Sequence, residues 1–255
     1  MTWSEASDAD SGIAGYYVLA ACDNGMIGMC GTNARPSIAP TFGVENMLGT
    51  NPLTFAFPTD EEFPFLLDCA TSITQRGKIE EYARDGKPTL AGKVIGTAGL
   101  PRTDSAAILE ELVRGDAALL PVGGAGEDLA GYKGYGYATV AEILSAALQS
   151  GAFLKQVTGM NVGHCFFAAD IAAFNDLAAF KKQTGDMLRA LRASRRAPGA
   201  TRIFTPGEKE YEVMRDRQRR GIPVPAGVAI SHSVGLTLLT FLFTMTQVPL
   251  ESVAL

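Results

Sequence analysis

The sequence predicts an α/β protein whose short apolar strands alternate with helices, so that a mixed β-sheet is flanked by helices. Apolar runs of strand length recur along the chain and are bounded by Gly, Pro and Asn. Segments with helical spacing lie between those runs. The 255 residues, of which 47% are hydrophobic and 19% charged, are enough for a large core in one domain or two.

The first elements are expected before residue 85. Residues 12–24 have helical spacing, and Gly25 suits the position just after a helix. Ser72 is expected to cap a helix that turns Ile79 and Tyr82 towards the interior. The expected strands are Met26–Cys30, Leu53–Phe57 and Phe65–Leu67, the last of them fully buried.

Glycine dominates the middle of the chain. Residues 84–104 are expected to be mostly loop, because they are rich in Gly, Pro, Lys and Thr. Residues 121–136 hold six glycines, a density that predicts a loop rather than a packed helix or strand. The remaining expected elements are a helix at 137–149, a strand at His164–Ile171, a helix through Phe174–Leu191, a short strand at Ile203–Phe204 and a charged helix ending at Arg220.

The domain boundary is expected near residue 225. Residues 1–225 form the predicted globular region, and residues 226–255 form a divergent apolar tail. Within the tail, Val234–Val248 is uncharged, but it is shorter than the roughly 20 residues of a bilayer span and contains four threonines. We expect a buried element or an exposed tail there, and no membrane helix. The acidic start lacks the apolar segment of a signal peptide.

Composition excludes several classes of function. The net charge is −5 and no long Lys/Arg run is present, so the sequence offers no basic segment of the kind that binds nucleic acid. The four cysteines form no C-x-x-C and the chain has two histidines, so no zinc site is expected. Scattered cysteines are typical of a reducing compartment, which predicts a cytoplasmic protein. The P-loop, G-x-S-x-G, H-E-x-x-H and Rossmann glycine motifs are all missing.

Three junctions between loops and helices carry polar groups suited to a nucleotide. Asp68 ends a predicted strand and could accept hydrogen bonds from a ribose, or it could cap a helix. Lys133 ends the glycine-rich stretch and could meet a phosphate at a helix start, or it could be an ordinary surface lysine. Residues 206–208, Pro-Gly-Glu, begin the charged helix. They could form part of a binding site, or they could simply be a well-formed helix N-terminus.

These residues, in this order, resemble the type-2 malate/L-lactate dehydrogenase family. That family also includes ureidoglycolate, sulfolactate, diketogulonate and Δ1-piperideine-2-carboxylate dehydrogenases or reductases. The resemblance covers about residues 12–225. The matching runs are Gly12–Tyr17, Thr32-Asn33, Leu48–Pro52, Asp68–Ser72, Gly77–Ile79, Leu120–Gly124, Tyr132–Gly136, Glu142–Ser145 and Pro206–Glu208.

The resemblance implies a non-Rossmann NAD(P)-binding fold and a homodimer. It implies hydride transfer between NAD or NADP and a small 2-oxo or 2-hydroxy acid, or a related imine. By position, the residues implied to contact the cofactor are Asp68, Cys69 in place of the usual Met, Ala70, Tyr132, Lys133, Pro206, Gly207 and Glu208.

The sequence departs from the family pattern near its start. Asp10 stands where the family has the histidine that exchanges a proton with the substrate. An aspartate of ordinary pKa is ionised at neutral pH and is a poor proton donor to an alkoxide. The family's N-terminal helical region and its substrate-binding arginines have no counterpart in the sequence given. Two alternatives to an active dehydrogenase therefore stay open: a non-catalytic dinucleotide-binding protein and a truncated family member.

Overall fold

The computed structural model describes residues 13–223. Asp10 and the tail 226–255 lie outside the described residues, so the expectations for them stay predictions, as does the boundary near residue 225. The chain divides into two compact units, Met1–Lys209 and Glu210–Leu255. All described strands and helices belong to the first unit, except that most of the last helix belongs to the second. In the second unit, the described residues 210–223 complete helix α6, Glu208–Arg220.

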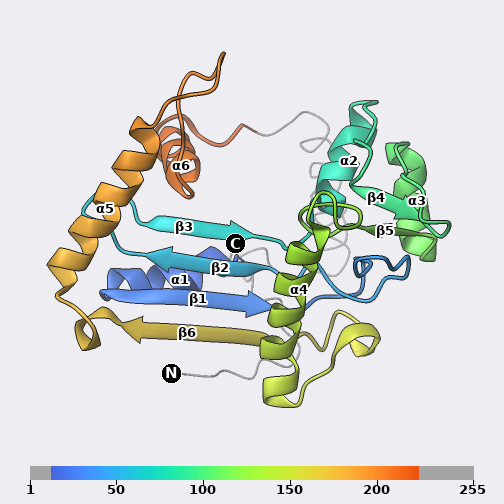
Figure 1. The fold of residues 1–255 in the computed structure, drawn as a ribbon, viewed down its shortest axis with the longest axis horizontal. Helices are drawn as coiled ribbons and strands as arrows, with labels where there is room; N and C mark the ends of the chain where they lie inside the picture. The colour runs from blue at the N-terminus through green and yellow to red at the C-terminus, as the bar shows by residue number, and fades with distance from the viewer. Residues whose placement is uncertain (1–12, 224–255) are drawn as a thin grey trace, which may run out of the picture. The chain divides into compact units, whose positions relative to one another are not determined.

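A four-stranded sheet forms the centre of the first unit (Figure 1). Its strands follow the order β3-β2-β1-β6, and each neighbouring pair is antiparallel. Gly28 of β1 is opposite both Ala56 of β2 and Ala168 of β6. The α/β class is confirmed, and so are the expected strands of this sheet. Their bounds are Met26–Thr32 for β1, Leu53–Phe57 for β2, Phe65–Cys69 for β3 and His164–Asp170 for β6.

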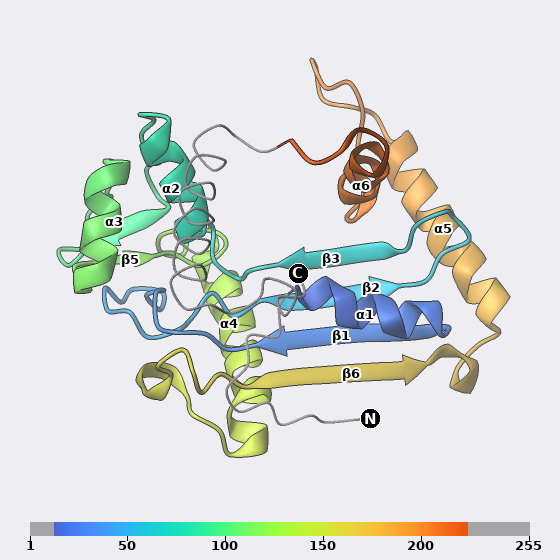
Figure 2. The same cartoon turned by 180° about the vertical axis from the view of Figure 1, so that it is seen from behind.

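Helices cover both faces of this sheet (Figures 1 and 2). Helix α1, Ala14–Asp23, packs on one face, where Val18 and Cys22 are buried against Cys30 and Ala56. The helix approaches β1 closely because Gly28 has no side chain: a Cβ there would lie 2.6 Å from the carbonyl oxygen of Val18. On the other face, α4, Gly131–Ser145, crosses the strands near the end where β1 and β3 finish (Figures 1 and 2).

A smaller layer contains the two-stranded sheet β4–β5 with helices α2 and α3. Its core includes Ile79, Val94, Ile108 and Leu119, all buried. Asp104 caps α3 by accepting hydrogen bonds from two backbone amides of the first turn. The sequence did not predict α3, β4 or β5, and β4 lies within the stretch 84–104 predicted to be mostly loop. The bounds are Arg76–Arg84 for α2, Val94–Gly96 for β4, Ser105–Arg114 for α3 and Ala117–Leu119 for β5.

The rest of the first unit contains one long helix and three single turns. Helix α5, Leu177–Ala193, begins at Asp176, whose side chain accepts from the amide of Ala179 at 2.8 Å. The short 3₁₀ turns are Ala147–Gln149, Leu154–Gln156 and Ile171–Ala173. Within residues 13–223, no helix combines the length and the apolarity that a membrane span requires.

Four local predictions are wrong. Helix α4 begins at Gly131, inside the stretch predicted as loop. Helix α2 begins at Arg76, so Ser72 does not cap it; Ser72 instead forms a bridge with Pro121, which buries its hydroxyl. Strand β3 is only half-buried, because it lies at the edge of the sheet. Residues 203–204 form no strand in the described structure, because the chain there runs into the turn before α6.

Candidate dinucleotide site

Strand β3 and the residues after it connect all three segments that the sequence singles out. The amide of Leu66 donates to the carbonyl oxygen of Pro206 at 3.3 Å. Asp68 follows on the same strand. Beyond the strand, the carbonyl oxygen of Thr71 accepts from the amide of Val122 at 2.8 Å, and Val122 lies directly against Gly134 of α4. The three segments are thus joined through β3, the strand at the edge of the sheet, and through the residues that follow it.

Asp68 holds the start of α1. One carboxylate oxygen accepts the amide of Gly15 at 2.8 Å, and the other accepts the hydroxyl of Thr54 at 3.0 Å. Gly15 lies in the first turn of α1, whose end carries partial positive charge and unpaired amides. Asp68 therefore does cap a helix, but one more than fifty residues before it in the chain and not the helix that follows it. Each oxygen retains a lone pair for a further donor.

Cys69 and Ala70 follow Asp68 at the end of β3. Cys69 is exposed, and its thiol is free, as are the other three cysteines. Partial burial raises the pKa of the Cys69 thiol, and the neighbouring charge of Asp68 adds to the shift. The thiol is therefore a neutral side chain at neutral pH and a poor nucleophile.

The start of α4 presents Tyr132 and Lys133 to solvent. The ammonium of Lys133 lies 5.8 Å from the centre of the Tyr132 ring. The N-cap residue Ala130 makes no side-chain cap, although the amide of Lys133 donates to its carbonyl oxygen at 3.0 Å. An anion at this helix start would therefore be bound by the amides before Lys133 and by the Lys133 ammonium. The helix can start here because Gly134 has no side chain: a Cβ would lie 2.4 Å from the carbonyl oxygen of Val122. The glycines in this motif permit close packing, and the expected flexible loop is absent from residues 131–136.

The Pro206-Gly207-Glu208 segment forms a tight turn against β3. Gly207 has a positive φ of 89°, and a Cβ there would lie 3.0 Å from Leu66. The carboxylate of Glu208 accepts the amide of Thr205 at 2.9 Å, as in a capping box. Burial raises the pKa of Glu208, but the hydrogen bonds from Thr205 and the charges of Arg192 and Arg202 outweigh burial and hold it below the ordinary value.

A buried carboxylate that the sequence did not single out fixes α4 to the sheet. Glu142 accepts from the side-chain amide of Asn51 at 2.7 Å, from that of Asn33 at 3.3 Å and from the backbone amide of Leu154 at 2.8 Å. We name Asn33, Asn51, Glu142 and the Leu154 amide the Glu142 cluster. The backbone oxygen of Asn51 also accepts the hydroxyl of Thr71 at 3.1 Å. The cluster therefore links α4 to the segment that follows Asp68.

A signal for this cluster was present in the sequence. Asn33, Asn51 and Glu142 each belong to a run that resembles the dehydrogenase family. The spacing of these runs does not indicate that they meet, since Asn51 and Glu142 are 91 positions apart. Buried Asn and Glu side chains require partners, so the membership of all three residues in family-like runs was the available indication.

The site chemistry consists of an exposed carboxylate, an exposed ammonium and helix amides along one sheet edge. Such groups suit the ribose and the phosphates of a dinucleotide. Within residues 13–223, no group of three or more His, Cys, Asp or Glu is placed to hold a metal ion. His164 is buried on β6, next to Phe166. Asp10, predicted at the position of the proton donor, lies outside the described residues.

Sequence comparison gives close relatives. The "Malate dehydrogenase" of Pyrococcus horikoshii is 44% identical over 218 residues, which are 84% of this chain and 59% of the relative. The L-sulfolactate dehydrogenase of Methanocaldococcus jannaschii is 36% identical over 205 residues, or 78% of this chain and 55% of the relative. The chain thus spans less than two thirds of the length of these relatives.

Comparison with solved structures also gives malate dehydrogenases. The crystal structure of malate dehydrogenase from Entamoeba histolytica matches with a TM-score of 0.85 and 40% identity, covering 96% of this chain and 68% of that one. The Pyrococcus horikoshii enzyme matches with a TM-score of 0.74 and 41% identity, covering 86% and 59%. The family model described as "Malate/L-lactate dehydrogenase" matches residues 6–230. The chain therefore belongs to the malate/L-lactate dehydrogenase family.

Proposed function

We propose that this chain binds NAD or NADP as part of an oxidoreductase that interconverts a small 2-hydroxy acid and its 2-oxo acid. One observation carries the proposal: the Asp68, Lys133 and Pro206–Glu208 segments share one sheet edge, linked through Leu66, Thr71 and Val122. When bound, the nicotinamide would donate or accept the hydride. Malate is the first substrate to test, because the relatives at 43–44% identity are named malate dehydrogenase.

The described residues have distinct roles in this proposal. Lys133 and the first amides of α4 would bind phosphate oxygens. Asp68 would accept a hydrogen bond from a ribose hydroxyl while still holding α1. Cys69, Ala70 and Tyr132 would line the same edge, and Pro206, Gly207 and Glu208 would complete it. The relatives' names leave the choice of dinucleotide open; one of them, from Escherichia coli, is "Ureidoglycolate dehydrogenase (NAD(+))".

Titration tests the binding step. The purified chain should bind NADH or NADPH, seen as an increase in nicotinamide fluorescence, and Lys133→Met should weaken binding on the order of tenfold by removing one phosphate contact. Lys182→Met is a matched control, because Lys182 lies on α5 and pairs with Asp186. If neither dinucleotide bound, the proposal would be wrong.

A second candidate is a dinucleotide-binding protein without turnover. Asp10, in the place of the family's histidine, favours it. Turnover should be measured for this chain and for Asp10→His. The substrates are malate and other 2-hydroxy acids with oxidised cofactor, and 2-oxo acids with reduced cofactor. Turnover only in the variant supports the second candidate, whereas turnover by the unaltered chain rules it out.

We also propose that the protein acts in the cytoplasm as a homodimer. The family resemblance supports the dimer, and free cysteines, three of them buried, support a reducing compartment. Sedimentation of the purified protein should give twice the mass of the chain, and a monomer at micromolar concentration would contradict the dimer.

A further inference from the structure

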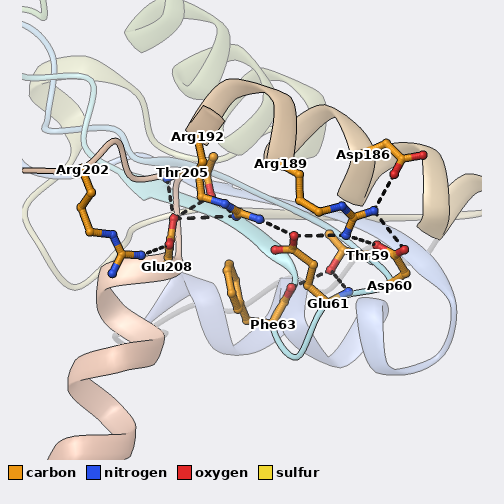
Figure 3. A network of polar contacts seen from close by, with 10 residues as sticks. All are labelled: Thr59, Asp60, Glu61, Phe63, Asp186, Arg189, Arg192, Arg202, Thr205 and Glu208. Carbon is orange, nitrogen blue, oxygen red and sulfur yellow. Dashed lines mark hydrogen bonds and ion pairs between the residues drawn. The ribbon is translucent and has the colours of Figure 1, made fainter. Parts of the chain in front are cut away.

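Arg192 of α5 lies between two acidic side chains that are far apart in the chain (Figure 3). Its guanidinium pairs with Glu61, in the loop between β2 and β3. It also donates to the hydroxyl of Thr205 at 3.1 Å and lies 3.8 Å from the Glu208 carboxylate. We name Glu61, Arg192, Thr205 and Glu208 the Arg192 cluster.

The cluster is nearly closed to solvent. The side chains of Arg192, Glu61 and Glu208 are 19%, 13% and 6% exposed. The guanidinium also lies 5.8 Å from the centre of the Phe63 ring, a favourable cation–π arrangement. The guanidinium thus donates to one carboxylate and one hydroxyl and faces a second carboxylate, so these contacts together define its position.

Arg192 contacts the residues on both sides of the Pro206–Gly207 turn. Thr205 accepts from Arg192, and its hydroxyl and amide both donate to Glu208, so the two ends of the turn are tied to the same guanidinium. The turn between them contacts β3 through the hydrogen bond from Leu66 to Pro206. Glu61 anchors the arrangement from the loop that precedes β3.

We infer that Arg192 is a positioning residue that seats the Pro206–Gly207 turn against β3 and so completes the dinucleotide site. The inference rests on the proposed function, because it concerns the affinity of that site. Arg192 need not touch the cofactor: it acts through Thr205 and Glu208. Its neighbour Arg189 also pairs with Glu61, and with Asp60 and Asp186, but in the described structure it makes no hydrogen bond or ion pair to Thr205 or Glu208. It is therefore a control on the same helix for the contacts with the turn.

Dinucleotide affinity tests the functional half of the inference. Arg192→Gln should raise the dissociation constant for NADH or NADPH on the order of tenfold, since small displacements of binding groups have large effects. Arg192→Lys should recover part of that loss, because lysine keeps the positive charge but lacks the planar guanidinium that can contact two acceptors at once. Arg189→Gln should stay within about twofold of the unaltered chain. Equal affinity in Arg192→Gln and Arg189→Gln would overturn the inference.

Hydrogen exchange tests the structural half without any cofactor. The amide of Leu66, which donates to Pro206, should exchange faster in Arg192→Gln than in Arg189→Gln. If Arg192→Gln fails to fold, Thr205→Val removes the hydroxyl that Arg192 contacts and should give the same result. Unchanged Leu66 exchange would overturn the inference. A chain that binds no dinucleotide at all would refute the proposed function, while the exchange result would still decide whether Arg192 seats the turn.

Discussion

The Glu142 cluster and the Arg192 cluster hold two parts of the proposed site by different chemistry. In the Glu142 cluster, one buried carboxylate accepts from neutral amides of Asn33, Asn51 and Leu154. In the Arg192 cluster, a cation lies between two carboxylates, and Arg202 at its rim adds a further ion pair to Glu208. Helix α4 is therefore fixed by amide donors, and the Pro206–Gly207 turn by charge.

The difference has energetic consequences. A buried acceptor that serves several donors cannot be removed without leaving each donor unsatisfied. The ion pairs of the Arg192 cluster depend in addition on ionisation, because protonation of a carboxylate removes its attraction to the guanidinium. We therefore expect α4 to be the rigid part of the site and the turn to be the part that responds to pH.

Removal of the Glu142 carboxylate should have the largest effect. Glu142→Ala removes the acceptor of the Leu154 amide and one of the two acceptors of each Asn33 and Asn51 side-chain amide, so it should lower the free energy of unfolding by about 3 to 5 kcal/mol. Urea denaturation measures this loss. Glu142→Gln keeps one acceptor oxygen and should cost clearly less; an equal loss in both variants would mean that hydrogen bonding to this residue is not what holds α4.

The glycines of α4 provide a matched pair. Gly134→Ala should destabilise the protein by about 1 to 3 kcal/mol, because the new methyl group meets the backbone of Val122. Gly136→Ala should stabilise it by about 0.5 to 1 kcal/mol, since nothing lies within 4 Å of the new methyl group and alanine favours a helix. Thermal unfolding of both variants should give shifts of opposite sign. Shifts of the same sign would contradict the close packing of the helix start.

Acid should weaken the Arg192 cluster. Because the pKa of Glu208 is lowered in the folded state, its charge stabilises the fold above the ordinary carboxyl pKa, and this contribution is lost as the pH falls through the lowered value. Unfolding free energies measured from about pH 6 to about pH 3 should therefore fall less steeply in Glu208→Gln than in the unaltered chain. If the unfolding free energies of the two proteins fell in parallel, the Glu208 carboxylate would not be the cause of the lost stability in acid.

The two clusters should act independently. They share no residue, so the effects of Glu142→Gln and Arg192→Gln on stability should add within about 0.5 kcal/mol in the double variant. Within the Arg192 cluster, Arg192→Gln and Thr205→Val should not add, because both act on the same hydrogen bond. If the coupling between the two clusters were as large as the coupling within the Arg192 cluster, the clusters would not be independent.

The sequence predicts local elements well where one strong periodicity decides them. The strands of the main sheet and the helices α1, α5 and α6 were expected from apolar spacing and flanking Gly or Pro. Helix α3 and strand β5 were missed. The glycine-rich start of α4 was predicted wrongly, because propensity disfavours a helix that close packing against Val122 makes possible.

The candidate site shows the same limit. Asp68, Lys133 and Glu208 could be named from motifs, but not the connections between them. Asp68 caps α1, and this depends on the antiparallel pairing of β2 and β3 that brings Thr54 and Asp68 together. Arg192 has no motif at all: its role depends on which carboxylates the fold places around it.

Hydrogen exchange with and without reduced dinucleotide tests the central claim most directly. We expect slower exchange on binding in three separate segments at once: residues 66–72, residues 131–136 and residues 204–208. These segments become one footprint only if they line one pocket. Binding that protects one of them alone, or only residues elsewhere in the chain, would contradict a shared dinucleotide site.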